Sequence, residues 1–212
     1  MSIQPLYGLR LRTPRLELRL GSHDELIALA RLAEDGIHPP EEMPFGVAWS
    51  DGIGEPGFVD EFVGFHEGQL AAWSQDGWHL NLLVWAQGQL AGTQTVGAER
   101  FAETSVVGTG SWLGARFQRR GYGTEMRAAV LELAFRELGA VAAESSWMVG
   151  NRASARVSEK LDYHEVGVSE IAPRGVPVPH HKVRVDRDSW RCPVPVDIAG
   201  LAACLPLFGL TV

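Results

Sequence analysis

Apolar and charged residues alternate along residues 9–20, on either side of Thr13-Pro14, and this period of two predicts a half-buried strand. Ser22 can cap a helix whose apolar positions recur at helical spacing until about Gly36. Residues 58–73 show the same spacing with phenylalanine, leucine and tryptophan side chains. The first third of the chain is therefore predicted to be one strand followed by two helices.

The remaining pattern predicts six more strands and two more helices. A helix over residues 121–138 is predicted from its apolar stripe and from Gly139, which ends it. Asn151 caps a second, short helix. The predicted strands are, in chain order, residues 78–86, 89–98, 106–115, 141–149, 163–171 and 179–186.

Two segments have no regular period. Residues 37–57 are rich in proline and glycine, which predicts a long ordered loop. Because this loop also carries Met43, Phe45 and Trp49, it is expected to form a packed cap over the core, a wall of a substrate site, or both. Residues 191–212 are apolar and broken by prolines, so we expect an extension that packs on the domain of residues 1–190 or on a partner chain in a homo-oligomer.

Composition narrows the class of protein. The 212 residues are 45% hydrophobic and 21% charged, which suits one globular domain. No run of about 18 apolar residues and no signal peptide is present, so a cytoplasmic protein without a membrane partner is expected. The net charge of −7 disfavours a nucleic-acid surface. Cys192 and Cys204 have no zinc spacing, so free thiols and no metal site are expected.

Residues 111–126, SWLGARFQRRGYGTEM, are the stretch with the clearest chemistry. They predict a strand, a basic turn and the start of a helix, with Gly121 and Gly123 allowing a sharp bend and close approach of a ligand. The first N–H groups of a helix have no intrahelical acceptor, and the helix dipole adds positive potential there. Three arginines stand beside this point: Arg116, Arg119 and Arg120. A phosphate group is the expected guest, and an ordinary helix start is the alternative.

The spacing Gln118-x-x-Gly121-x-Gly123 resembles the pyrophosphate-binding signature of the GCN5-related N-acetyltransferase (GNAT) family, which binds coenzyme A (CoA). Asn151-x-x-Ser154 opens the second helix at the spacing that this family uses. Residues 9–20 are similar to the first strand of the ribosomal-protein N-acetyltransferase branch. The segments SWLG, GYGTEM and PLFG, and the MPF and tryptophan of the long loop, resemble a bacterial subgroup described as succinyl-CoA-dependent.

The resemblance spans nearly the whole chain and implies the GNAT fold. That fold is α/β, with a mixed and mostly antiparallel central sheet of about seven strands, flanked by helices. The sheet is splayed between its fourth and fifth strands, which are here residues 106–115 and 141–149. CoA would lie in the gap.

The resemblance also implies an activity, the transfer of an acyl group from acetyl-CoA or succinyl-CoA to a primary amine. The amine would attack directly in a ternary complex, because neither cysteine has the setting of an activated thiolate. The acceptor could be a protein N-terminus, a lysine or a small molecule. The backbone N–H of Leu113 or Gly114 would polarise the thioester, and Ser154 would protonate the leaving thiolate. The residues expected to bind CoA are Trp112, Leu113, Gly114, Gln118, Arg119, Arg120, Gly121, Tyr122, Gly123, Thr124, Asn151 and Ser154.

Several alternatives stay open at this point. Ser154 could be an ordinary residue of a helix start. His38 in the long loop and Glu99 at a strand end are candidate general bases acting through water, although the family often manages without one. A catalytically weak CoA-binding sensor or interaction module is the second hypothesis. A nucleotide-phosphate binder is the third, and the absence of both G-x-G-x-x-G and GxxxxGK[ST] argues against it.

Overall fold

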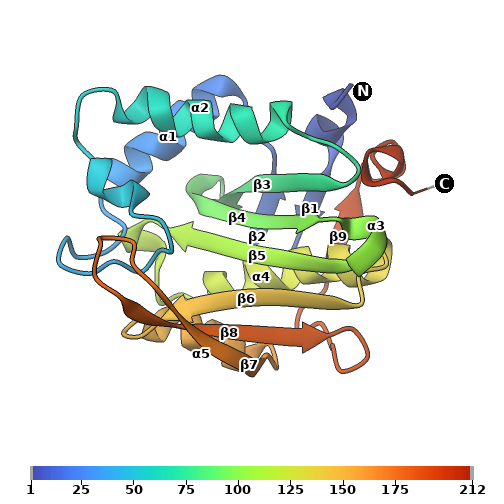
Figure 1. Ribbon diagram of the computed structural model, residues 1–212. Coiled ribbons are helices and arrows are strands. Elements are labelled where there is room, and N and C mark those ends of the chain that lie inside the picture. Colours follow the sequence, from blue (N-terminus) through green and yellow to red (C-terminus); the bar gives the residue numbers. More distant parts are fainter. Residues whose placement is uncertain (1, 211–212) are drawn as a thin grey trace.

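The computed structural model describes residues 2–210 (Figure 1). Its helices are α1 (His23–Glu34), α2 (Phe58–Ala71), α3 (Phe101–Thr104), α4 (Tyr122–Glu132) and α5 (Arg152–Lys160). Its strands are β1 (Arg10–Arg12), β2 (Leu16–Arg19), β3 (Gly77–Ala86), β4 (Gln89–Glu99), β5 (Val106–Leu113), β6 (Ala142–Met148), β7 (His164–Ile171), β8 (Val178–Asp186) and β9 (Asp197–Ala199). They form one mixed sheet in the order β7-β8-β6-β5-β4-β3-β2-β1-β9.

The predicted α/β class and the flanking helices are confirmed. In Figure 1, α1 and α2 lie together along one side of the sheet, and α4 lies behind the central strands. α1 packs on β4 and α2 on β3, while α4 contacts β2, β4 and β5 from the other face. The core between these layers is fully buried at Leu29 of α1, Leu80 of β3 and Leu131 of α4.

The sheet has nine strands rather than about seven, for two reasons. Pro14 has no N–H to donate, so the first predicted strand breaks there into the antiparallel pair β1 and β2, with Leu11 opposite Leu18. The C-terminal segment adds β9 beside β1, with Ile198 opposite Leu11.

The sheet is splayed where the sequence predicts it. β5 and β6 are parallel and pair only from Val106 opposite Ala142 to Gly108 opposite Glu144 within the described residues. β6 then pairs along its length with β8, and β5 with β4. At the point of divergence, the Ser145 hydroxyl donates to the carbonyl oxygen of Thr109 at 3.1 Å. Beyond Gly108 and Glu144 the two strands are no longer hydrogen-bonded to each other within the described residues, and we call this unpaired stretch the gap.

The predicted helix over residues 121–138 is divided. α4 ends at Glu132 and continues as a π-helical turn over Leu133–Glu137, with the Leu138 N–H donating to the Leu133 carbonyl oxygen at 3.1 Å. Gly139, at φ +75°, ends this helix as predicted.

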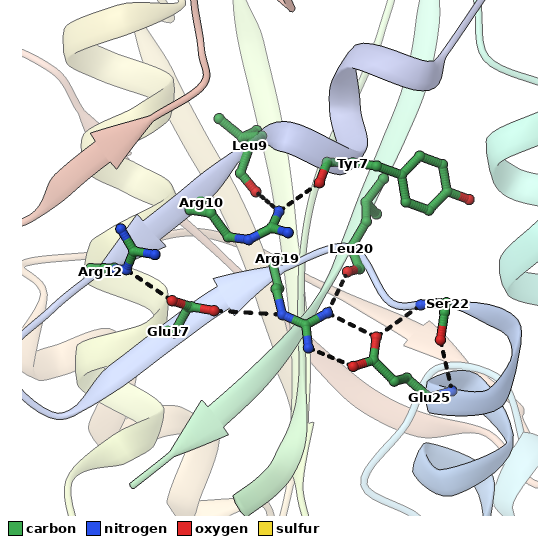
Figure 2. A network of polar contacts seen from close by, with 9 residues as sticks. All are labelled: Tyr7, Leu9, Arg10, Arg12, Glu17, Arg19, Leu20, Ser22 and Glu25. Atoms are coloured by element: carbon green, nitrogen blue, oxygen red, sulfur yellow. Dashed lines mark hydrogen bonds and ion pairs between the residues drawn. The ribbon is translucent and has the colours of Figure 1, made fainter. Parts of the chain in front are cut away.

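The start of α1 is fixed by a network of ion pairs (Figure 2). Ser22 and Glu25 form a capping box, in which each side chain accepts the other residue's backbone N–H. Arg19 of β2 donates to the Glu25 carboxylate at 2.8 Å, and this hydrogen bond is the main reason why the pKa of Glu25 is lowered to about 2. The network continues across the hairpin through Glu17 to Arg12.

The C-terminal segment packs on its own chain over the residues that the structure describes. After β9, a short turn over Leu205–Phe208 places the Phe208 ring 4.8 Å from Trp78 and 5.3 Å from Trp73. The Trp73 indole N–H donates to the Leu207 carbonyl oxygen at 3.0 Å. Residues 211–212 of the predicted extension lie outside the described residues, and the division at residue 190 and the homo-oligomer stay predictions. None of the helices described is long and apolar enough to span a membrane.

Candidate functional site

A tight turn joins β5 to α4, and we call residues 114–121 the elbow. A short 3-10 turn over Ala115–Phe117 leads to Arg119 at φ +58° and Gly121 at φ +82°. Gly121 takes this left-handed conformation at little energetic cost, whereas Arg119 must be held in it by its surroundings. The Gln118 amide provides part of that support, because it donates to the carbonyl oxygens of Leu113 at 2.8 Å and Ile37 at 2.7 Å.

The elbow delivers the chain into an uncapped helix. Gly121 is the N-cap of α4 and offers no side-chain acceptor, so the first N–H groups of the helix remain free for an anion. Arg119 and Arg120 are exposed at this turn, while Arg116 donates to Asp35 at 3.2 Å. All three arginines are therefore exposed, and only Arg116 has an ion-pair partner among the described residues.

The edge of β5 that faces β6 has no ladder partner beyond Gly108 in the described part of the chain, although side chains donate to the carbonyl oxygens of Thr109 and Leu113 there. The Gly114 N–H donates to the Ala91 carbonyl oxygen of β4 at 2.9 Å. Successive residues of an antiparallel strand direct their backbone groups to opposite edges, so the N–H of Leu113 faces the gap instead. Of the two donors considered for the thioester, only Leu113 is available.

The helix α5 packs against α4 and β6. The Asn151 side-chain oxygen accepts the Ser154 N–H at 3.0 Å, which confirms the predicted helix cap. A Cβ added to Gly123 of α4 would lie 3.4 Å from the Val157 side chain, so α4 and α5 meet closely there. Ser154 is half-buried beside this contact.

Residues 15–164 match the family model of the acetyltransferase (GNAT) domain. The chain belongs to the GNAT family. The resemblance in the sequence assigned one region of the chain to CoA. That region contains the unpaired edge of β5, the elbow and the uncapped start of α4.

Solved structures share this fold. RimJ from Mycobacterium smegmatis, in complex with CoA-disulfide, superposes with a TM-score of 0.69 at 18% identity, covering 87% of this chain and 90% of that one. RimL, a ribosomal L7/L12 alpha-N-protein acetyltransferase in complex with coenzyme A, gives 0.65 at 16% identity, with 82% and 95% covered. A GNAT-family acetyltransferase from Bacillus anthracis gives 0.65 at 16% identity, with 85% and 99% covered.

The long loop of this GNAT chain, residues 37–57, packs over the face of β5 that carries Trp112. The Trp49 ring lies 5.8 Å from Trp112 and 5.0 Å from Phe45, and it also contacts Phe62 of α2 at 5.7 Å. A 3-10 turn over Trp49–Gly52 holds Trp49 in place. The loop therefore forms the packed cap that its composition predicts, while Phe45, Trp49 and Trp112 stay only partly buried.

His38 is close to the elbow, but its ring is fully engaged. Its Nδ1 lies 2.8 Å from the Pro39 carbonyl oxygen, and its Nε2 lies 2.8 Å from the Ser50 hydroxyl. In the neutral imidazole, Nδ1 must carry the proton because Pro39 offers only an acceptor, so the Nε2 lone pair accepts the Ser50 hydroxyl. His38 can therefore take a proton from another group only through the Ser50 hydroxyl or after that hydroxyl has moved away.

The structure does not bring Glu99 to the other candidates. Gly92 of β4 lies opposite Leu113 at the open end of the gap, and Glu99 lies opposite Gly77 at the other end of β4. Seven residues of extended strand separate Gly92 from Glu99, about 23 Å at ~3.3 Å per residue. Glu99 therefore lies at the end of β4 that is near the paired part of β5 and β6, far from Leu113.

Sequence reasoning missed three residues at the elbow. The Glu125 carboxylate, in the first turn of α4, accepts hydrogen bonds from the Thr13 hydroxyl at 2.6 Å and from Nε of Arg15 at 2.6 Å. The only signal in the sequence was an acidic residue beside a basic turn. That signal does not indicate which residues, more than a hundred positions away, are its partners. Among the described residues, no group of three or more histidine, cysteine and acidic side chains could hold a metal ion.

Proposed function

We propose that this protein transfers an acyl group from acyl-CoA to a primary amine by direct attack in a ternary complex. One observation carries the proposal: within the described residues β5 has no ladder partner on its β6 side beyond Gly108, and the elbow joins it to the N-terminus of α4, which no side chain caps. This arrangement offers backbone donors at two places, on β5 and at the start of α4, to a long ligand that ends in phosphates. Membership of an acetyltransferase family supports the same chemistry.

The pyrophosphate of CoA would bind the N–H groups from Arg119 to Thr124. These donors lie at the positive end of the α4 dipole, and the side chains of Arg119 and Arg120 add charge in a chain of net charge −7. Gln118, Tyr122 and the glycines act by shaping the elbow. The pantetheine arm would extend along Trp112, Leu113 and Gly114.

At the reacting end, the Leu113 N–H would polarise the thioester carbonyl and hold the oxyanion that forms there. Ser154 would donate its hydroxyl proton to the departing thiolate, since it lies at the start of α5, the helix that follows β6. Asn151 would contribute by fixing that helix start, which its hydrogen bond to Ser154 already does.

We propose no dedicated general base. The Nε2 lone pair of His38 is engaged by Ser50, and Glu99 lies at the far end of β4. An α-amine has an ordinary pKa of about 7.7 to 8.0, so an appreciable fraction is neutral near pH 7, whereas a lysine amine near 10.4 needs more help. This difference favours an α-amine or a small-molecule amine of low pKa as acceptor. His38 would act as a base only through the Ser50 hydroxyl or after Ser50 had released it.

The first test is calorimetric titration of the protein with acetyl-CoA, succinyl-CoA and free CoA, followed by a thiol-release assay with amine acceptors. We expect binding of all three and thiol release with acetyl-CoA. Succinyl-CoA bound tenfold more tightly, about 1.4 kcal/mol, would indicate a site for its distal carboxylate and make succinyl the donor. Absence of CoA binding would refute the proposal. Binding without thiol release for any amine would favour a CoA sensor, and effective competition by ATP would favour a nucleotide-phosphate site.

A further inference from the structure

The turn between β1 and β2 packs against the first turn of α4, although the two are more than a hundred residues apart in the sequence. Glu125 is the point of contact, and its side chain is only 4% exposed. Its carboxylate accepts the Thr13 hydroxyl at 2.6 Å and the backbone N–H of Arg15 at 3.1 Å. A buried carboxylate is stable only when it is paired and hydrogen-bonded, so these contacts fix the hairpin turn to the helix.

The Arg15 guanidinium then links the helix to the elbow. Its Nε donates to Glu125 at 2.6 Å, a second nitrogen forms an ion pair with the same carboxylate, and the third donates to the carbonyl oxygen of Arg120 at 2.9 Å. The guanidinium also lies 5.0 Å from the centre of the Tyr122 ring. A Cβ on Gly121 would lie 3.2 Å from Arg15, so the two groups are in near contact.

Holding the Arg120 carbonyl decides where the next N–H points. In a planar trans peptide the C=O and N–H groups point in opposite directions. With its C=O bound to Arg15, this peptide directs the Gly121 N–H away from Arg15. Arg119 and Gly121, on either side, both have positive φ, and a non-glycine residue keeps such a conformation only where its surroundings impose it.

Arg15 also changes the electrostatics of the anion site. A carboxylate in the first turn of α4 stabilises the helix but repels an anion bound at the same terminus. Arg15 neutralises Glu125 from the side, which leaves the helix dipole and the exposed Arg119 and Arg120 to attract a phosphate. The same guanidinium thus orients the elbow and removes the nearest opposing charge.

We propose that Arg15 is a positioning residue for acyl-CoA: together with Glu125 it fixes the elbow in the conformation that binds the pyrophosphate. This inference rests on the proposed function, because it assumes that a CoA pyrophosphate is the ligand of the elbow. Arg15 acts through the backbone of residues 120 and 121 and contacts no reacting atom.

The test compares acetyl-CoA with S-acetyl-pantetheine, which has the same thioester but no pyrophosphate. In the Arg15→Gln variant we expect KM for acetyl-CoA to rise about 10- to 100-fold, as for the loss of a hydrogen bond to a charged group, with kcat and the acceptor KM little changed. The kcat/KM for S-acetyl-pantetheine should stay within about twofold of wild type. Arg15→Lys should fall between the two, because a single ammonium cannot bridge Glu125 and the Arg120 carbonyl as a guanidinium does.

Two further variants keep the result interpretable. Arg12→Ala removes an arginine of the same hairpin that pairs with Glu17 at 2.8 Å and has no contact with the elbow, so it should leave both donors unaffected. Arg15→Gln combined with Glu125→Gln removes both charges, so that no buried carboxylate is left unpaired, and should show the same selective loss.

Wild-type protein that does not bind CoA would defeat the proposed function itself. A wild type that binds CoA, with folded Arg15 variants that bind it equally well, would overturn the positioning role. Equal losses for acetyl-CoA and S-acetyl-pantetheine would also overturn it, because a general structural defect does not distinguish the two donors.

Discussion

The elbow region and the loop region of this protein are held in place by different kinds of contact. The elbow region comprises β5, the elbow and the first turn of α4, and the loop region comprises residues 37–57 and the β7–β8 turn at residues 172–177. In the elbow region the contacts involve backbone groups and the buried Glu125, so a single conformation is imposed. The loop region packs through Phe45 and Trp49, and among the described residues only exposed side chains join its two parts: Arg174 donates to the Asp51 carboxylate at 2.9 Å and to the Pro40 carbonyl oxygen at 3.0 Å.

This difference fits a division of labour between the two substrates. A site for the constant part of acyl-CoA gains from a fixed backbone, because its donors need no reorganisation when the ligand binds. We expect the loop region to form a wall of the acceptor site, as predicted for residues 37–57 from their composition, and such a wall can vary in sequence without disturbing the fold. The tips of the loop region are apolar and open to solvent, with Val47 72% exposed and Val176 67% exposed. Substitutions in the two regions should therefore have effects of different size and on different substrates.

The largest effect is expected from Gly123→Trp in the elbow region. Even a Cβ at this position would lie 3.4 Å from Val157, so an indole must displace α5 or cover the first N–H groups of α4. Calorimetry should show CoA affinity reduced by about 10³-fold or more. The control is Gly64→Trp on α2, where a Cβ would have no neighbour within 4 Å. Retained affinity in folded Gly123→Trp would refute the assignment of the elbow.

Ser154→Ala should slow transfer about 10- to 10³-fold, the usual consequence of losing one acid–base group. CoA affinity should be unchanged, because the helix cap uses the backbone N–H of Ser154, which alanine retains. Stopped-flow or steady-state thiol release measures the rate, and Ser154→Thr, which keeps a hydroxyl, should recover part of it. An unchanged rate in Ser154→Ala would return this serine to the role of a helix-start residue.

The same contrast explains what the sequence could predict. Most of the elbow region falls in residues 111–126, where the strand period, the glycines and the arginines follow one another, so its geometry follows from local rules. The Asn151 cap was predictable for the same reason, whereas the splay was expected only from the resemblance to the family. Breakage of the first strand at Pro14 was readable in principle, because proline cannot donate to a ladder.

The parts that the sequence did not predict depend on contacts between distant segments. The Arg15–Glu125 pair joins positions 110 residues apart, and the Arg174–Asp51 pair joins positions 123 apart. Neither pair has a local pattern, since an exposed arginine and an arginine that fixes a buried carboxylate look alike in one sequence. Likewise, nothing near Glu99 indicates that it lies at the far end of β4 from the gap.

A third prediction concerns His66 on α2, beneath the loop region. Its ring lies 4.8 Å from Phe62, and its Nδ1 has no hydrogen-bond partner within the described residues. Burial lowers the pKa of His66 from 6.5 to about 4. The unfolded chain therefore takes up this proton first as the pH falls, so the stability contributed by the neutral ring is complete above about pH 6.5 and is lost progressively toward pH 4.

Because the pKa of His66 is lower in the folded than in the unfolded chain, the free energy of unfolding should fall by about 2 kcal/mol between pH 7 and pH 5. Urea unfolding at both pH values measures it, and His66→Phe, which keeps an aromatic ring beside Phe62, should lose about that much less stability over the same interval. The same pH dependence in both proteins would show that other groups control the acid response.

The smallest effect is expected from Arg174→Ala. The Asp51 carboxylate loses its partner, and the loop loses the hydrogen bond to Pro40, but both side chains are exposed and their attraction is screened by solvent. We expect KM for the acceptor to rise about threefold, with CoA affinity unchanged.

The Arg174 hydrogen bond lowers the pKa of Asp51, so the ion pair is complete above the ordinary pKa of 3.8 and weakens as the pH falls through the lowered value. Added salt should reproduce part of the effect in wild type and none in the variant. A change in CoA affinity instead would mean that the two regions are coupled through Gln118, whose amide already contacts Ile37 at the start of the loop.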